Sequence, residues 1–217
     1  YTWEIIHMLR TGDQYRDSIR DGREVWVDGK KVENVPNHPV FKPIVDIRAR
    51  IYDMAHENEF SKKLTYQDES NGEKNCIGSK LPKTQNDWLA KREAIKTIMY
   101  EIGAVVTRVG DETAGEMWSL YDGTDILNEV DPRFGENIAD HIQKVLKSDI
   151  FHVSANTDPK GDRSKLPQDQ DPDMLLHAVK ETDEGIVVRG AKYETAAAYA
   201  NQAFVKPTIA NWGDQKL

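Results

Sequence analysis

The spacing of apolar residues changes within one stretch near the middle of the chain, Ile138-Ala-Asp-His-Ile-Gln-Lys-Val-Leu-Lys-Ser-Asp-Ile-Phe-His-Val-Ser-Ala-Asn-Thr157. Ile138, Ile142 and Val145 are spaced by four and three, which is typical of one face of an amphipathic helix. The last seven residues of the stretch are instead typical of a strand. The stretch therefore predicts an α+β fold, in which the helices end near Asp149 and a β region begins directly afterwards.

The sequence upstream of this stretch predicts further helices and one hairpin. Asn37 is expected to cap a helix that has Pro39 in its first turn, and Asp28-Gly29 suits a type I′ turn between two short strands. Residues 58–84 are polar and irregular. The predicted segments are helices over residues 11–22, 37–54, 87–106, 111–127 and 134–146 and a hairpin over residues 24–32.

Two of these helices are expected to bury a defined apolar face, because their apolar residues recur every three or four positions. The two faces consist of Val40, Ile44, Ile47, Ile51 and Met54, and of Trp88, Ile95, Ile98, Met99, Ile102, Val105 and Val106. Downstream of Thr157, a long polar loop covers residues 158–173. Three strands are then predicted, over residues 174–179, 185–190 and 202–206.

Composition and charge exclude several classes of protein. The 217 residues include 29 Lys and Arg against 37 Asp and Glu, so the net charge is -8 and no global basic field exists to collect nucleic acid or an anionic membrane. Cys76 is the one cysteine, which excludes a disulfide framework and any cysteine-rich metal or iron–sulfur site within this chain. No apolar run approaches the roughly 18 residues of a membrane span. We therefore expect a soluble protein of a reducing cytoplasm.

Both ends of the chain carry an expectation. Residues 1–7 precede Met8, and we expect them to be an upstream extension or a cloning remnant. The chain stops at Leu217, soon after the last predicted strand. Because so few strands cannot cover one another, we expect the chain to be one piece of a longer polypeptide or one subunit that pairs with a partner carrying the rest.

The segment Thr157-Asp-Pro-Lys-Gly-Asp-Arg-Ser164, here named the candidate loop, directly follows the predicted strand. Successive backbone N–H groups together with Lys160 and Arg163 are groups that can hold a phosphate or the carbonyl edge of a flavin. The alternative is an ordinary solvated loop held by an ion pair between Asp162 and Arg163. The loop lacks the Gly-Lys-Ser/Thr ending of a Walker loop.

The other polar residues carry weaker signals. His152 immediately precedes the candidate loop, but no two of the six histidines have the i, i+4 spacing of a helical zinc site, so no metal is expected. Lys91 and Arg92 lie on the long predicted helix, on the side expected to face away from Ile95 and Ile98. There they form either a solvated surface or a contact for an anion or a substrate.

Four motifs stand out along the chain. They are Leu9–Gly29, Asn37-His-Pro39, the candidate loop, and Gly185-Ile-Val-Val-Arg-Gly-Ala-Lys192. Together, and in this order, they resemble the 4-hydroxyphenylacetate 3-hydroxylase oxygenase family from about Leu9 to the C-terminus. The resemblance implies an acyl-CoA dehydrogenase-like fold with a helical N-terminal domain, a β-barrel-like middle domain and a C-terminal four-helix domain. Residues 8–149 would form the first domain and residues 150–217 the start of the second, with the third absent from this chain.

The resemblance implies two chemistries. Most members of the family resemble two-component monooxygenases, which take reduced FAD from a separate flavin reductase and use oxygen to hydroxylate a phenol. A related branch contains 4-hydroxybutyryl-CoA dehydratase, which uses FAD and an iron–sulfur cluster. The candidate loop, taken alone, is closer to the dehydratase branch. That branch holds two cluster cysteines on the long helix, whereas the corresponding residues 105–110 include no cysteine.

This chain also departs from the phenol-hydroxylating members at three places. Those members carry an arginine and a tyrosine four residues apart near the start of the long helix, where Ala90–Ala94 supplies Arg92 but no tyrosine. A histidine that such members often carry just before the loop is replaced by Ser154. The threonine that binds the flavin near its reactive nitrogen falls at Ala196, with Thr195 one residue early.

The resemblance therefore implies the oxygenase component of a reduced-FAD-dependent monooxygenase acting on a small phenol-like or heteroaromatic substrate. Its partners would be a flavin reductase, oxygen, and further subunits in a homo-tetramer or a hetero-oligomer, and Arg92 would contact the substrate. The alternatives are a flavin-dependent acyl-CoA dehydratase or isomerase and a non-catalytic half-subunit, and no residue is identified as the catalytic base. The expected flavin contacts are Ser154, Ala155, Asn156, Thr157, Lys160, Gly161, Asp162, Arg163, Thr195 and Ala196.

Overall fold

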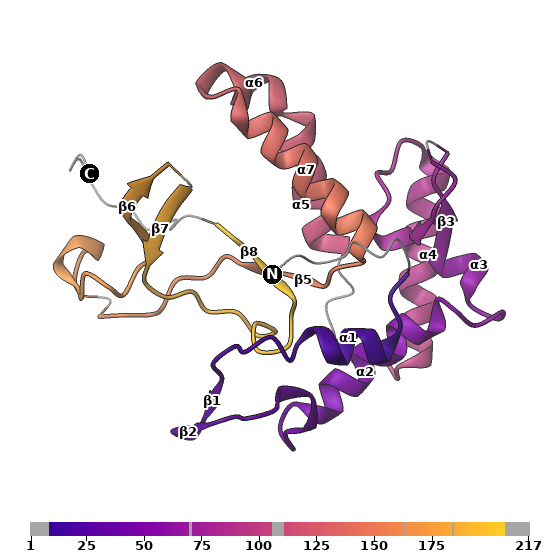
Figure 1. Ribbon diagram of the computed structural model, residues 1–217, viewed down its shortest axis with the longest axis horizontal. Helices are drawn as coiled ribbons and strands as arrows, with labels where there is room; N and C mark the ends of the chain where they lie inside the picture. The colour runs from indigo at the N-terminus through magenta and orange to yellow at the C-terminus, as the bar shows by residue number, and fades with distance from the viewer. Residues whose placement is uncertain (1–8, 70, 106–110, 163, 184, 207–217) are drawn as a thin grey trace. The chain divides into compact units, whose positions relative to one another are not determined.

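A computed structural model describes residues 9–69, 71–105, 111–162, 164–183 and 185–206 of the chain (Figure 1). It divides into two compact units. Unit 1 comprises Tyr1–Phe151 together with Ala198–Asn201, and unit 2 comprises His152–Ala197 together with Gln202–Leu217. The expectations about residues 1–7 and about the last residues of the chain lie outside the described residues.

Unit 1 is mainly helical (Figure 1). Within the described residues it contains α1 (Gly12–Ser18), α2 (Lys42–Met54), α3 (Ser61–Leu64), α4 (Gln85–Glu101), α5 (Asp111–Asp122), α6 (Thr124–Val130) and α7 (Arg133–Ser148). It also contains two short antiparallel hairpins, formed by β1 (Trp26–Val27) with β2 (Lys30–Lys31) and by β3 (Thr65–Gln67) with β4 (Lys74–Cys76). The expected turn between β1 and β2 is confirmed, because Asp28 and Gly29 both have positive φ.

The first helix begins at a reciprocal cap. The hydroxyl of Thr11 accepts a hydrogen bond from the N–H of Gln14, and the side chain of Gln14 accepts one from the N–H of Thr11. The N–H of Gly12 donates to Oδ1 of Asp53 on α2 at 2.7 Å. A Cβ at Gly12 would lie 2.6 Å from Oδ2 of Asp53, so only glycine lets α1 approach α2 this closely.

The predicted start of the second helix is wrong. Asn34, rather than Asn37, acts as a cap, and it caps a short 3₁₀ turn over Val35–Asn37. The helix α2 begins only at Lys42, with Pro43 in its first turn. The physical reason is Pro39, because the residue before a proline is disfavoured in helical conformation, and His38 is extended at φ -68° and ψ 132°.

The buried residues that the structure describes in unit 1 include two apolar clusters. One joins α2, α3 and α4 and consists of Ile51, Met54, Leu64, Ile77, Ala94 and Ile98. The other joins α5 and α7 and consists of Ala114, Met117, Ile142 and Val145. The helical spacing of Ile142 and Val145 therefore buries the face that the sequence predicts.

The predicted faces of α2 and α4 are only partly right. Val40 precedes α2 and Val105 follows α4, so neither belongs to a helix and both are exposed. Trp88 lies in the first turn of α4 with 62% of its surface exposed, and Val106 lies outside the described residues. The buried face of α2 includes Val45 and Arg48 beside the predicted Ile51 and Met54.

Two further segments differ from the prediction. The helix expected over residues 111–127 is divided at Gly123 into α5 and α6. The polar region over residues 58–84 contains α3 and the β3–β4 hairpin instead of being irregular throughout. A short hairpin with few apolar residues gives little periodic signal, which is why the sequence pattern misses it.

Among its described residues, unit 2 contains two small sheets. Strand β5 (His152–Ala155) pairs in parallel with β8 (Gln202–Val205), and His152 lies opposite Gln202. Strand β6 (His177–Thr182) pairs antiparallel with β7 (Gly185–Arg189). Isolated bridges join Thr157 to Tyr193 and Leu175 to Ala191. The α+β class is confirmed, since the helices of the described chain precede the strands of unit 2.

Candidate functional site

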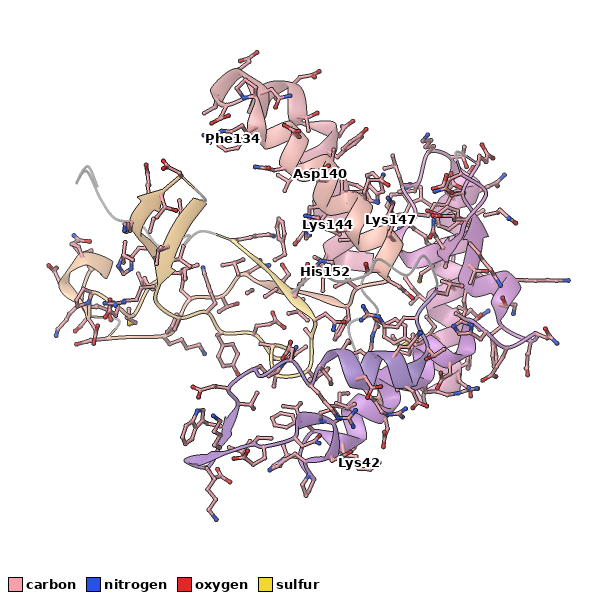
Figure 2. All side chains as sticks on the ribbon, in the orientation of Figure 1. Lys42, Phe134, Asp140, Lys144, Lys147 and His152 are labelled. Atoms are coloured by element: carbon pink, nitrogen blue, oxygen red, sulfur yellow. The ribbon has the colours of Figure 1, made fainter. Side chains whose placement is uncertain are left out.

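The candidate loop begins where the buried strand β5 ends. Ser154 and Ala155 are buried within β5, and the hydroxyl of Ser154 donates to Oδ1 of Asn156 at 2.8 Å. His152, labelled in Figure 2, is also buried in this strand, with its Nε2 2.9 Å from Oε1 of Gln202 on β8. The side chain of His152 therefore joins the two paired strands.

The structure brings the candidate loop together with residues 191–196, the second segment expected to contact a flavin. The N–H of Tyr193 donates to the carbonyl of Thr157 at 2.8 Å, across an antiparallel bridge. A few residues further on, Ala196 is 2% exposed, whereas Thr195 is exposed and donates to Glu194 at 3.3 Å. Two stretches far apart in the sequence thus form one local surface of unit 2.

An ion pair that the sequence did not single out joins the same two segments. The ammonium of Lys192 lies 2.7 Å from Oδ1 of Asp158, and the two side chains are only 7% and 13% exposed. Lys192 also donates to the carbonyl of Asn156 at 3.4 Å. Asp158 belongs to the candidate loop and Lys192 to the motif over residues 185–192. Neither motif by itself indicates that these two residues form an ion pair.

The tip of the candidate loop is exposed. A Cβ at Gly161 would lie 2.0 Å from Oε1 of Gln170 and 2.3 Å from Sδ of Met174, so a side chain at this position would require those two side chains to move. The carboxylate of Asp162 accepts from the hydroxyl and the N–H of Ser164, and these bonds hold its pKa below the usual value. Arg163, and with it the expected ion pair to Asp162, lies outside the described residues.

The loop also presents donors that fit an anionic or carbonyl-bearing ligand. Across the described ranges, the backbone N–H groups of Lys160 and Gly161 donate to no protein acceptor. Within the same ranges, the ammonium of Lys160 forms no ion pair. The nearby Lys165, in contrast, pairs with Asp162 at 3.9 Å. Free backbone donors beside a free ammonium are the groups that a flavin carbonyl edge or a phosphate requires.

Unit 1 contains a separate cavity of about 40 Å³, enough for about three water molecules. Its polar lining comes from Arg48 and Tyr52 of α2, Lys91 of α4, Cys76, and Asp149, which follows α7. The ammonium of Lys91 donates to the carbonyl of Gly78 at 2.7 Å. The remaining lining is mostly apolar and consists of Ile51, Ala55, Leu64, Ile77, Gly78, Ala94, Ile95 and Ile98.

This cavity corrects the prediction for the long helix. Lys91 is 6% exposed and lines the cavity beside Ile95 and Ile98, not on the opposite side of α4. Arg92, the residue expected to contact a substrate, is exposed and is not part of the lining. The signal that could have placed Lys91 is its spacing, because Lys91, Ile95 and Ile98 stand at i, i+4 and i+7 and so share one face of α4.

Burial raises the pKa of two groups in the lining. Burial raises the pKa of Asp149, against the opposing effect of the positive charges of Arg48 and Arg10. Burial likewise raises the pKa of the Cys76 thiol to about 11, and the charge of Asp149 adds to that effect. Cys76 is therefore a protonated, weakly nucleophilic thiol at neutral pH.

Two kinds of site are not found in the part of the chain that the structure describes. No group of three or more His, Cys, Asp or Glu side chains lies close enough to hold a metal ion. Of the helices described, none is both long enough and apolar enough to cross a membrane.

Comparison with known proteins places the chain in a family. A family model described as 4-hydroxyphenylacetate 3-hydroxylase N terminal matches residues 11–216. The chain is 29% identical to the 4-hydroxyphenylacetate 3-monooxygenase oxygenase component of Thermus thermophilus, over 96% of this chain and 43% of that protein. It is also 29% identical to the 4-hydroxybutyryl-CoA dehydratase/vinylacetyl-CoA-Delta-isomerase of Clostridium aminobutyricum, over 94% of this chain and 42% of that protein.

A solved structure shares the fold. The crystal structure of a 4-hydroxyphenylacetate 3-monooxygenase oxygenase component, complexed with FAD and 4-hydroxyphenylacetate, matches with a TM-score of 0.81 and 29% identity. The match covers 91% of this chain and 41% of that one. The fold is thus the N-terminal part of an acyl-CoA dehydrogenase-like architecture, as the four motifs imply. The chain spans less than half the length of each of these relatives.

Proposed function

Because this chain belongs to the 4-hydroxyphenylacetate 3-hydroxylase N-terminal family, we propose that it forms the N-terminal part of the oxygenase component of a two-component monooxygenase. The enzyme would use reduced FAD, delivered by a separate flavin reductase, to hydroxylate a small aromatic substrate. In this proposal residues 8–149 are the helical domain and residues 150–217 begin the middle β domain. The working enzyme would be a cytoplasmic oligomer, either a homo-tetramer or an assembly with a chain that carries the C-terminal helices.

One observation carries the flavin part of the proposal. The candidate loop and residues 191–196 meet at the bridge between Thr157 and Tyr193, and the loop beside that bridge presents free donors at Lys160 and Gly161. A flavin ring system carries carbonyl acceptors at one edge, and such acceptors bind best to donors already held in place. The loop follows closely after strand β5, all four residues of which are buried.

The residues proposed to contact the flavin are those of the loop and the joined segment. When bound, the reduced flavin would supply the electrons that activate oxygen. The protein groups would hold the flavin by N–H and ammonium donors at the loop tip and by the surface near Ala196. The proposed contacts remain Ser154, Ala155, Asn156, Thr157, Lys160, Gly161, Asp162, Arg163, Thr195 and Ala196.

The cavity of unit 1 suggests where this unit could hold a polar group of the substrate. The room for about three water molecules is close to that of a carboxylate, and Lys91 supplies a cation beside it. We therefore propose Lys91, in addition to Arg92, as a candidate substrate contact. Measuring the dissociation constant of 4-hydroxyphenylacetate for Lys91→Met and for Arg92→Met distinguishes the two candidate contacts. Replacing the residue that contacts the substrate should weaken binding about tenfold, and replacing the other should leave it unchanged.

Dehydration of an acyl-CoA is the second candidate, because the Clostridium dehydratase is as similar to this chain as the Thermus monooxygenase component. Against it stands the chain's one cysteine, Cys76, which leaves too few thiolates here for the two cluster cysteines that the branch carries on its long helix. A non-catalytic half-subunit is the third reading. It would bind neither reduced FAD nor substrate.

An anaerobic titration of the purified protein with reduced FAD tests the proposal. We expect saturable binding, followed by oxygen consumption and a hydroxylated product when an aromatic substrate and oxygen are added. Turnover of an acyl-CoA without oxygen would select the dehydratase, and no binding of reduced FAD would reject both enzymes.

Variants then locate the flavin. Lys160→Met should weaken reduced FAD binding, since a hydrogen bond to a charged group is typically worth about 1.5–3 kcal/mol. Lys180→Met, on the exposed face of β6, is the matched control and should bind normally. Arg163→Ala is expected to behave like Lys160→Met, and an unchanged affinity in both would favour the solvated loop.

A further inference from the structure

The enclosed ion pair between Asp158 and Lys192 has no counterpart among the other ion pairs that the structure describes in unit 2. Arg189 and Asp173 are 3.6 Å apart with 64% and 52% of their side chains exposed. The pair of Lys165 and Asp162 is similarly exposed. Only the Lys192 and Asp158 side chains are nearly enclosed, and their charged atoms are the closest, at 2.7 Å.

An enclosed ion pair is a poor way to gain stability. Moving two charges out of water costs several kcal/mol per ion. The attraction between the two charges often does no more than offset this desolvation cost. Replacing both partners by neutral groups is therefore often harmless, whereas removing one leaves an uncompensated charge. A role in positioning explains the pair better than a contribution to stability.

The neighbours of the pair show what it positions. Asp158 lies between Thr157, which bridges to Tyr193, and Pro159, which restricts Asp158 to extended backbone conformations. Lys192 directly precedes Tyr193, and its ammonium also reaches the carbonyl of Asn156 at 3.4 Å. One ammonium thus holds the chain on both sides of Thr157.

We propose that Asp158 and Lys192 are positioning residues that fix the candidate loop against residues 191–196 and so hold the flavin donors in place before the flavin binds. This inference rests on the proposed function for its ligand, but the ordering of the loop is a property of the free protein. The free donors at Lys160 and Gly161 begin two residues after Asp158, so a change at Asp158 moves them directly.

The test compares three variants with one matched control. Asp158→Asn and Lys192→Met each remove one charge at similar size, and the double variant removes both. Asp173→Asn removes one charge from the exposed pair with Arg189 and serves as the control. Thermal unfolding, amide hydrogen exchange without flavin, and the dissociation constant of reduced FAD are measured for each.

We expect both single variants to lose thermal stability, and the double variant to regain it because neither charge of this pair is left facing the other's neutral replacement. In all three, the Tyr193 amide should exchange about tenfold faster and reduced FAD should bind about tenfold more weakly. The control should match the wild type. If a single variant fails to fold, the double variant is compared with the wild type and the control instead.

A purely structural pair would give a different result, because FAD affinity would return together with stability in the double variant. That result, or unchanged Tyr193 exchange, would overturn the inference. A wild-type protein that does not bind reduced FAD would instead reject the proposed function. Tyr193 exchange in the variants would then still decide whether the pair orders the loop.

Discussion

The guanidinium carbon of Arg48 lies 4.1 Å from the centre of the Phe151 ring and 4.8 Å from that of Tyr52. Arg48 is 5% exposed, so a charged side chain of α2 is held between two aromatic faces inside unit 1. The hydroxyl of Tyr52 donates to the carbonyl of Asp149 at 3.0 Å. A cation on an aromatic face is attracted more strongly when water is excluded, and these contacts hold α2 to the residues between α7 and β5.

Phe151→Ala should strongly destabilise the protein. Its side chain is 1% exposed, and removing a buried phenylalanine typically costs about 3–5 kcal/mol of unfolding free energy. Urea denaturation measures the change. Phe134→Ala is the control, because Phe134, labelled in Figure 2, is 41% exposed and should lose about 1 kcal/mol or less. Equal losses in the two variants would contradict the packing described for Phe151.

Two consecutive residues of α4 should respond differently to truncation. Lys91→Ala leaves the carbonyl of Gly78 without its donor and should lower the unfolding free energy by about 1–3 kcal/mol. Arg92→Ala, on the exposed side, should stay within about 0.5 kcal/mol of the wild type. Urea denaturation of both variants measures this difference. A larger effect at Arg92 than at Lys91 would show that α4 is rotated relative to the structure.

Cys76 should react slowly with iodoacetamide at neutral pH, because only the thiolate is alkylated and burial raises the pKa of this thiol to about 11. Mass spectrometry across a pH series should give a midpoint well above 9.0, the ordinary value for a thiol. The unfolded protein in denaturant is the control and should show the ordinary midpoint. A native midpoint near 9 would mean that Cys76 is open to water.

The same pKa shift predicts how stability depends on pH. The folded state holds the Cys76 proton more tightly than the unfolded state, so the unfolded thiol loses its proton first as the pH rises. The stability that this thiol contributes is therefore complete below pH 9 and is lost as the pH approaches about 11. Urea denaturation between pH 8 and pH 11 should show a smaller decline in Cys76→Ala than in the wild type.

Two glycine-to-alanine replacements should change the unfolding free energy in opposite directions. Gly115 lies in α5, and no other atom lies within 4 Å of the position that an added Cβ would take. Gly115→Ala should therefore raise the unfolding free energy by about 0.5–1 kcal/mol through its helix propensity. Gly12→Ala should lower it, because the new methyl group would meet Asp53 and the carbonyl of Ala49 at 2.6 and 2.7 Å. Thermal unfolding of the two variants provides the comparison, and a stable Gly12→Ala protein would contradict the close approach of α1 and α2.

Local patterns along the chain predicted its longer helices and the change from helices to strands. The spacing of Ile138, Ile142 and Val145 places a helix before Asp149, and the hairpin at Asp28-Gly29 follows from turn chemistry alone. The four motifs identify the family and the α+β class. These features depend on residues close together in the sequence, where side-chain spacing and backbone preference act directly.

Tertiary structure alone decided which distant groups meet. Asp158 and Lys192 are 34 positions apart, and nothing local shows that they form an enclosed pair. Helical spacing places Lys91 on the face of Ile95 and Ile98, but only the tertiary structure shows that this face lines a cavity. Arg48 interrupts an apolar face but is buried, since the rings of Tyr52 and Phe151 cover its charge. The physical reason is that burial and pairing depend on neighbours supplied by the whole fold, whereas periodicity records only the residues of one segment.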